Sequence, residues 1–409
     1  MNKLLLLTAL VLLPTTAFAR ADTDGDGVPD VDDTCPAEDA SFFDGDGDGC
    51  IDPFAHARHI EFLDPADLPL EYVIHEDGAP NVADDTTPFT PGADLQAVQD
   101  GFAVWDGVSD ATLSSSYLGT TTERNADGLD GINHVTFRDE DFLSLFGNAV
   151  IAVGITTSFT EPTEFQGEIV RPGRIVDADM LFNPNRTFSA GTSDSAVEIV
   201  AVAAHEAGHL FGLNHSALPD ATMFPALPAG FDATTLEIDD EVLAYMSYPD
   251  PASVANATQM SGVVTDGTAG IPGAAVFALP AGTDTPVAVQ FTFPDGSWTI
   301  AGLPPGDYDV FVAPLDGGDA VSGVVPGYIN DLVNDTAQTL FLSEFHSTPE
   351  SLDDDRDART SITLAPGAPV TGVDVVTNSD VDAPVVLAST PTNGTEDYPD
   401  EIGRASCRE

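Results

Sequence analysis

Three histidines and one glutamate are spaced so that together they could hold and use a metal ion. His205 and His209 are four residues apart, so on a helix both imidazoles lie on one face. Glu206 lies beside that face, where it is poorly placed as a ligand but well placed to hold a metal-bound water. Gly212 allows a sharp exit from the helix, which would bring His215 back as a third ligand. Three protein ligands leave one position open for water, which is the coordination of a catalytic zinc ion.

Two alternatives to a catalytic site are open at this point. Two histidines and a glutamate at this spacing can occur by chance on a surface helix, although the added Gly212 and His215 make chance a much weaker explanation. The site could also bind a metal without turning substrate over. No substituted position in the pattern supports that second alternative.

A helix must carry the first two histidines, and a sheet must support that helix. Residues 195–211 are predicted to be helical, because Ser195 and Glu198 form a capping-box pattern ahead of an apolar run and Gly212 follows. Residues 91–249 as a whole have the pattern of a mixed α/β domain. Its other predicted elements are a helix at Ala93–Trp105 and strands at Val135–Phe137, Ala149–Ile155 and Ile175–Phe182.

The extended pattern HExxHxxGxxH resembles the active-site motif of the metzincin metallopeptidases. Ser216, directly after the third histidine, resembles the matrixin branch of that group. Residues 221–225 are similar to the family's Met-turn, with Met223 beneath the metal and Pro225 again favouring the matrixin branch. Two upstream runs are similar to bacterial matrixin-like enzymes, at residues 130–137 and 175–183.

This resemblance implies an α+β catalytic domain over residues 54–250, with its core from about residue 88. The implied architecture is a twisted mixed sheet, mainly parallel with an antiparallel edge strand, plus the active-site helix. An extended peptide would pair with that edge. Glu206 would be the general base and zinc the catalytic metal. The family also carries structural metal sites, to which His134, Asp177 and Asp179 would belong, unless they are ordinary hydrogen-bonding residues.

Residues 1–19 have the pattern of a signal peptide. Lys3 precedes an apolar stretch from Leu4 to Leu13, and residues 17–19 offer a small-x-small cleavage site. The apolar stretch is too short to span a bilayer, and no later segment is apolar enough to do so. We therefore expect a secreted protein, either released or associated with the cell surface, without a transmembrane segment.

The chain is strongly acidic, with 68 acidic against 12 basic residues and a formal net charge of −56. Such a charge repels nucleic acid and anionic membranes, so neither is an expected partner. Calcium binding, a saline habitat, or both would explain it.

Residues 20–53 are rich in aspartate and are predicted to bind Ca²⁺. Carboxylates at alternating positions, with Gly27 at the turn, are typical of a calcium loop. The predicted ligands are Asp22, Asp24, Asp26, Asp30 and Asp33. The stretch resembles a thrombospondin type 3 repeat, and a second, shorter run follows at residues 44–52. Cys35 and Cys50 lie close together in an exported segment and are expected to pair. The alternative is an acidic disordered linker.

The C-terminal part is predicted to be an all-β sandwich. Residues 257–378 alternate β-like runs with Gly, Pro and Asp turns and resemble a carboxypeptidase regulatory-like domain, a non-catalytic spacer or adhesion module. Residues 379–400 resemble the start of an immunoglobulin-like domain. Residues 401–409 break from the acidic composition and read like a translated sequencing adapter, so we expect them to be foreign to the natural chain.

The sequence therefore favours a secreted zinc endopeptidase that cleaves extracellular proteins or peptides, such as those of an extracellular matrix, with calcium in a structural role. The alternative is a calcium-stabilised surface adhesin with a vestigial protease domain. The sequence leaves the protein substrate and the oligomeric state open.

Overall fold

The computed structural model divides the chain into two units, Met1–His56 and Ala57–Glu409. The predicted signal peptide, calcium loops and Cys35–Cys50 disulfide fall in the first unit, where only Pro29 is described, so these predictions lie outside the described residues. The same holds for residues 379–400. In the second unit the structure describes residues 62–82, 91–124, 129–159, 162–191, 196–225, 234–314, 341–350, 358–377 and, for the backbone alone, 404–408.

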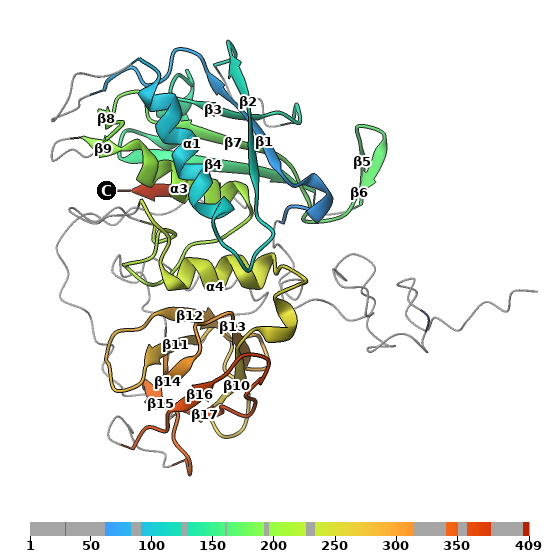
Figure 1. The fold of residues 1–409 in the computed structure, drawn as a ribbon, viewed down its shortest axis with the longest axis vertical. Helices are drawn as coiled ribbons and strands as arrows, with labels where there is room; N and C mark the ends of the chain where they lie inside the picture. The colour runs from blue at the N-terminus through green and yellow to red at the C-terminus, as the bar shows by residue number, and fades with distance from the viewer. Residues whose placement is uncertain are drawn as a thin grey trace, which may run out of the picture. The chain divides into compact units, whose positions relative to one another are not determined.

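A mixed six-stranded sheet forms the frame of the second unit's N-terminal part (Figure 1). Its strands are β1 (Leu70–His75), β2 (Ser115–Thr121), β3 (Asn133–Thr136), β4 (Val150–Ser158), β7 (Ile175–Phe182) and β18 (Arg404–Arg408), in the order β18-β4-β7-β3-β1-β2. The four strands from β7 to β2 are parallel, whereas β4 runs antiparallel to β7. The predicted mixed sheet with an antiparallel strand is therefore confirmed. Strand β18 also pairs antiparallel with β4, so both strands at this end of the sheet are antiparallel to their neighbours.

Strand β1 lies beside the edge strand β2, and the sequence analysis left its residues unassigned. Leu70, Tyr72 and Ile74 are buried and alternate with more exposed residues, which is the period of a half-buried strand. This alternation is the signal that would have identified the strand. Its pairing with β2 and β3 joins residues about 40 to 60 positions apart, a distance at which local patterns give no information.

Two helices, α1 (Ala93–Asp106) and α3 (Ile199–Leu210), pack together against the sheet (Figure 1). Helix α1 confirms the prediction for Ala93–Trp105. Helix α3 begins at Ile199, not at residue 195, so the predicted capping box is wrong. The physical reason is a short parallel pairing of β9 (Val197–Glu198) with β8 (Phe188–Ser189), which holds the backbone before Ile199 extended.

The crossing of α1 and α3 depends on a small residue at Gly101. A Cβ at this position would lie 2.5 Å from the Cβ of Ala203 and 2.8 Å from the backbone nitrogen of Ala204. Neither atom can move without moving α3, which carries the histidines.

We expect Gly101→Ala to lower the free energy of unfolding by about 1–3 kcal/mol, because overpacking outweighs the higher helix propensity of alanine. Urea denaturation monitored by circular dichroism would measure the change. Gly191→Ala is the matched control, since no atom lies within 4 Å of the added Cβ. Equal stabilities of the Gly101 and Gly191 variants would contradict the close crossing.

Helix α4 (Ile238–Ser247) follows the metal-binding segment in the chain and was not predicted. The N-terminal part of the second unit also contains these short elements: α2 (Phe142–Phe146), β5 (Thr163–Phe165), β6 (Glu168–Val170) and the 3-10 turns Pro65–Asp67 and Val254–Asn256. Glu237 and Asp240 form a capping box at the start of α4. An acidic first turn ahead of Val242 and Leu243 is the sequence signal that would have predicted it.

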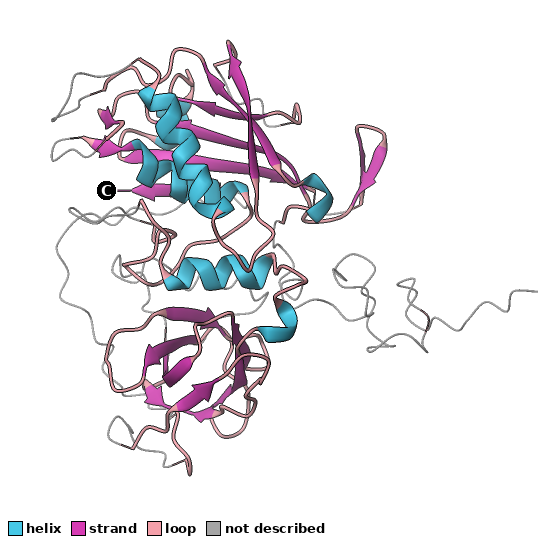
Figure 2. Cartoon of the chain, in the orientation of Figure 1, coloured by secondary structure: helices cyan, strands magenta, loops and turns pink. Residues whose placement is uncertain are grey.

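Between residues 259 and 376 the described residues form strands and loops but no helix (Figure 2). One sheet has the order β13-β10-β17 and the other β12-β11-β14-β15, with β16 pairing to β14. The strands are β10 (Gln259–Thr265), β11 (Ala275–Pro280), β12 (Ala288–Phe291), β13 (Ser297–Ala301), β14 (Gly306–Ala313), β15 (Glu344–Phe345), β16 (Ile362–Leu364) and β17 (Val375–Val376). These sheets are consistent with the expected all-β unit. Its resemblance to a carboxypeptidase regulatory-like domain stays a prediction.

Candidate metal centre

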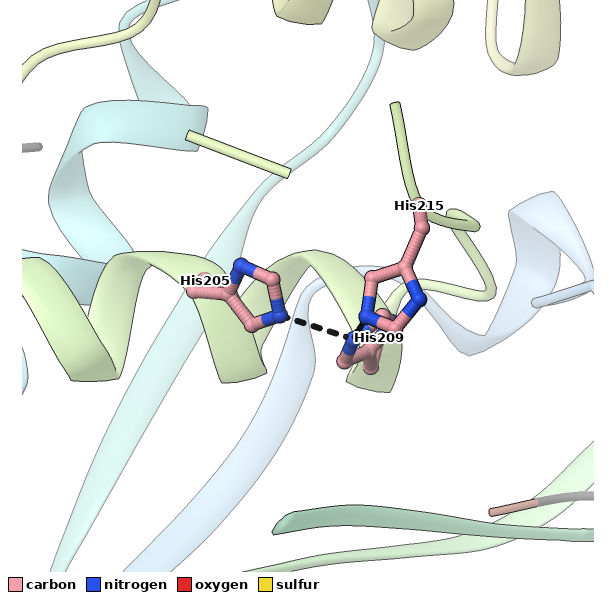
Figure 3. A group of neighbouring side chains, drawn as sticks. All are labelled: His205, His209 and His215. Carbon is pink, nitrogen blue, oxygen red and sulfur yellow. Dashed lines mark hydrogen bonds between the residues drawn. The ribbon is translucent and has the colours of Figure 1, made fainter. Parts of the chain in front are cut away.

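The three predicted histidines converge on one point (Figure 3). His205 and His209 project from successive turns of α3, and His215 reaches back from the loop that follows. The Nε2 atom of His209 lies 3.1 Å from Nε2 of His205 and 3.2 Å from Nε2 of His215. Within the described ranges, this is the one group of three or more His, Cys, Asp or Glu side chains whose ligand atoms gather closely enough for a metal ion.

Backbone carbonyls fix the orientation of two of these rings. Nδ1 of His205 donates to the carbonyl of Thr222 at 2.7 Å, and Nδ1 of His209 donates to the carbonyl of Leu213 at 2.9 Å. A carbonyl only accepts, so the proton must be on Nδ1 and the lone pair on Nε2. This is the tautomer that a metal requires, with the second nitrogen held by an outer partner.

The donor set fits zinc. Burial lowers the pKa of His205 to about 4, and it lowers the pKa values of His209 and His215 well below their usual value. The rings are therefore neutral at neutral pH, and the unprotonated Nε2 atoms of His205 and His209 face each other at 3.1 Å, a distance at which lone pairs repel. Tetrahedral zinc with bonds of 2.0–2.1 Å separates its nitrogen ligands by about 3.3 Å, close to the spacing found here.

Glu206 adds a buried carboxylate beside the histidines. Its side chain is fully buried, and neither carboxylate oxygen makes a hydrogen bond of ordinary geometry. Burial raises the pKa of Glu206 to about 8, and the nearby backbone N–H of Gly154 on β4 opposes this rise. A buried carboxylate without a partner is costly, so its oxygens are available to a water molecule or a cation at the site.

The turn at Gly212 brings the third histidine back to the helix. Gly212 has φ of +82°, in the left-handed region that glycine adopts readily. Its N–H donates to the carbonyl of His209 at 2.8 Å, and the N–H of Leu213 donates to the carbonyl of Gly208 at 2.9 Å. This pair of bonds is the Schellman motif that ends many helices. The structure therefore places Gly212 at the sharp exit that the sequence predicts.

Met223 lies directly against α3. It is fully buried, and its sulfur contacts the helix at Gly208, between the two helical histidines, where an added Cβ would lie only 2.3 Å away. The backbone N–H of Ser216 donates to the Met223 carbonyl at 2.9 Å. The loop after His215 thus closes onto the segment that supports His205.

Two buried aspartates on α4, which the sequence analysis did not single out, hold this loop. The Asp240 carboxylate accepts the backbone N–H groups of Thr222 at 2.8 Å and Met223 at 2.9 Å. Asp239 accepts the hydroxyl of Ser216 at 2.5 Å. Asp240 therefore supports His205 indirectly, because it holds Thr222, whose carbonyl fixes the orientation of the His205 ring.

His134, Asp177 and Asp179, predicted as candidates for a structural metal site, lie near one another but do not gather their ligand atoms at one point. The N–H of His134 donates to Asp179 at 2.8 Å, and the N–H of Gly131 donates to Asp177 at 2.7 Å. Burial, and then the neighbouring Asp177, raise the pKa of Asp179 to about 8. The contacts agree with the alternative given above, that of hydrogen-bonding residues.

Comparison with known proteins finds the same family that the motif resembles. The matrixin family model matches residues 145–246, which include the three histidines, Met223 and all of α4 but its last residue. The chain is 42% identical over 55 residues to metalloendoproteinase 4-MMP of Arabidopsis thaliana, covering 13% of this chain and 16% of that protein. Its identity to 5-MMP of the same plant is 48% over 46 residues, covering 11% and 13%. Its identity to matrilysin of Rattus norvegicus is 32% over 87 residues, covering 20% and 32%.

Each of these matches covers only a small part of the chain. The chain spans at most 32% of the length of these curated relatives. Residues 145–246 form a matrixin domain, and through it the chain is homologous to the matrixin-type metalloendoproteinases.

Proposed function

We propose that this chain is a zinc-dependent endopeptidase in which His205, His209 and His215 hold the metal and Glu206 is the general base. The observation that carries the proposal is the convergence of the Nε2 atoms of three histidines beside a buried carboxylate whose oxygens make no hydrogen bond of ordinary geometry. A surface helix with a chance pattern would not bury His205, Glu206 and His209 together and bring the half-buried His215 against them. The matrixin match over the same residues supports the same conclusion.

The chemistry divides between the metal and the chain. A zinc ion at the three histidines would supply Lewis-acid polarisation of the scissile carbonyl and of a water molecule. Glu206 accepts a proton from that water as it attacks the carbonyl, and then gives the proton to the departing amine. The buried surroundings exclude bulk water and so strengthen each of these interactions.

The exposed side of β4 is the proposed place for substrate. Strand β4 lies against α3, because a Cβ at Gly154 would be 2.8 Å from the Cβ of His209. The backbone of residues 404–408 pairs antiparallel with β4 in register with Gly154, which supports the idea that an extended segment can add here. A peptide bound in this way would gain affinity from main-chain hydrogen bonds and would pass beside the metal site.

We further propose that the enzyme is secreted and that its other segments are calcium-stabilised or all-β modules. The apolar start of the chain and the aspartates of residues 20–53 support export and structural calcium, and the sheets after residue 259 support a non-catalytic β-domain. Among the described residues, no helix is long and apolar enough to cross a membrane.

A surface adhesin with a vestigial protease domain is the rival, and metal removal separates the two. We expect a zinc-selective chelator to abolish cleavage of casein by the full chain, and added zinc to restore it. Without the metal, the three neutral histidines cannot polarise the scissile carbonyl or the attacking water. Excess calcium in every sample controls for the predicted loops. Cleavage that persists in a dialysed, zinc-free sample would contradict the proposal.

A further inference from the structure

Helix α4 is shared by two hydrophobic cores. Ala244 and Tyr248 belong to the core that holds α1, α3 and the six-stranded sheet. Val242, with Ile238 and Met246 beside it, belongs to the core formed by the strands after residue 259. The spacing of four residues within each set places the two sets on different faces of one helix. The β-strands therefore cover a face of α4 that would otherwise be apolar and exposed.

Asp239 lies where these two parts meet, and it is bonded to both of them. One carboxylate oxygen accepts the hydroxyl of Ser216 at 2.5 Å, and the other accepts the backbone N–H of Val289 on β12 at 2.8 Å. Asp239 is only 5% exposed, and Ser216 only 3%. Short bonds to a buried carboxylate are among the stronger hydrogen bonds in proteins.

Apolar contacts surround this polar link. Ala217, Leu218 and Ala221, in the loop after His215, form a small core with Ala275 and Val289 of the β-strands. Ser216 also accepts the N–H of Leu218 at 3.0 Å. The loop that carries the third histidine is thus packed on the β-sheet and bonded to it through one carboxylate.

We propose that Asp239 is a positioning residue, which couples the third histidine to strand β12 and so makes the β-domain a support of the metal centre. His215 projects from a loop and not from α3, so its place depends on the residues that anchor the loop. Ser216 is its immediate neighbour, and Asp239 holds the Ser216 side chain. This inference rests on the proposed function, because it assigns the coupling to a zinc ligand.

The link can be cut on either side. Ser216→Ala removes the bond toward His215. Val289→Pro removes the backbone N–H that bonds to Asp239 on the β12 side. Strand β12 lies at the edge of its sheet and this N–H points out of the sheet, so no hydrogen bond between strands is lost. Asp239→Asn leaves one acceptor oxygen for two donors, so at least one of the two bonds is lost or reversed in direction. Asp309→Asn is the matched control, since Asp309 is a fully buried carboxylate of the β-strands that bonds Ser361 and Arg359.

The experiment measures zinc affinity of the full-length variants by competition with a chromophoric chelator, and the visible spectrum of the cobalt(II)-substituted proteins. We expect the Ser216, Val289 and Asp239 variants each to raise the zinc Kd by about tenfold, since outer partners of metal ligands have effects of this size. Their cobalt bands should shift. Asp309→Asn should lower the thermal midpoint while leaving the Kd and the cobalt bands unchanged.

Each other result has a definite meaning. Wild-type zinc affinity and cobalt bands in the Asp239 and Val289 variants would overturn the coupling, even if both proteins melt at lower temperature. Equal shifts in the Asp309 control would also overturn it, because the effect would then be general destabilisation. A wild-type chain that binds no zinc would instead refute the proposed function itself. If Asp239→Asn does not fold, the Ser216 and Val289 variants decide the question.

Discussion

Replacing Glu206 with glutamine is expected to lower peptide hydrolysis by at least ~100-fold while one zinc ion remains bound. Glutamine has the shape of glutamate but cannot accept the proton of the attacking water. The three histidines are untouched, and their Nδ1 bonds to Thr222 and Leu213 do not involve Glu206. Cleavage of casein or gelatin, with zinc and calcium present, would measure the loss, and zinc content would be measured on the same samples.

The control for this variant is Glu71→Gln, which changes an exposed carboxylate on β1 without touching the site. The control should cut like the wild type. Cleavage by both the wild type and the Glu206 variant would mean a misassigned base or a contaminating protease. If neither protein cleaves although zinc is bound, three explanations are favoured: the adhesin alternative, a latent enzyme, or an unusual substrate.

Burial affects how Glu206 can perform this role. Its pKa of about 8 in these surroundings means that the neutral form would dominate at neutral pH without a nearby cation. A dication at the histidines would favour the carboxylate form, because opposite charges at short range lower the pKa of an acid. General-base activity of Glu206 and metal binding by the histidines are therefore coupled, and the proposal requires both.

The metal centre could be predicted from the sequence because its geometry is local. His205 and His209 are related by one helical turn, and Gly212 determines where the chain leaves α3. Spacing and residue type alone therefore predicted that these side chains and His215 would meet. The predicted start of α3 was wrong because residues 197–198 pair with β8, which lies outside the segment, and are held extended.

The contacts that hold the metal centre in place could not be predicted in the same way. Asp240 bonds to Thr222 and Met223, which are 18 and 17 residues away, and Asp239 bonds to Val289, which is 50 residues away. No periodicity relates these positions. The alternation of Leu70, Tyr72 and Ile74 could have revealed strand β1, but its pairing in the sheet could not be predicted, since its partners are distant in the sequence. Local chemistry was therefore predictable, whereas the buried contacts that hold it in place required the fold.

The other large effect is expected at the central ligand. His209→Ala should raise the zinc Kd by at least ~100-fold and abolish cleavage, because the loss of a ligand must exceed the 10–100-fold effect of losing an outer partner. His209 is the ring whose Nε2 approaches both of the others. Its removal leaves two histidine ligands, one fewer than a catalytic zinc ion usually has. Zinc content after dialysis and casein cleavage would be measured together.

His134→Ala is the matched control, because His134 is as buried as His209 but its ring bonds to Asp130, away from the centre, and its backbone N–H bond to Asp179 survives the change. Losing it should lower the thermal midpoint and leave one zinc ion bound. The comparison separates ligation from packing, since both variants remove a buried imidazole of the same domain. If the two variants lost zinc equally, the metal would depend on general stability, and the assignment of His209 as a ligand would fail. Full zinc content in the His209 variant would refute it directly.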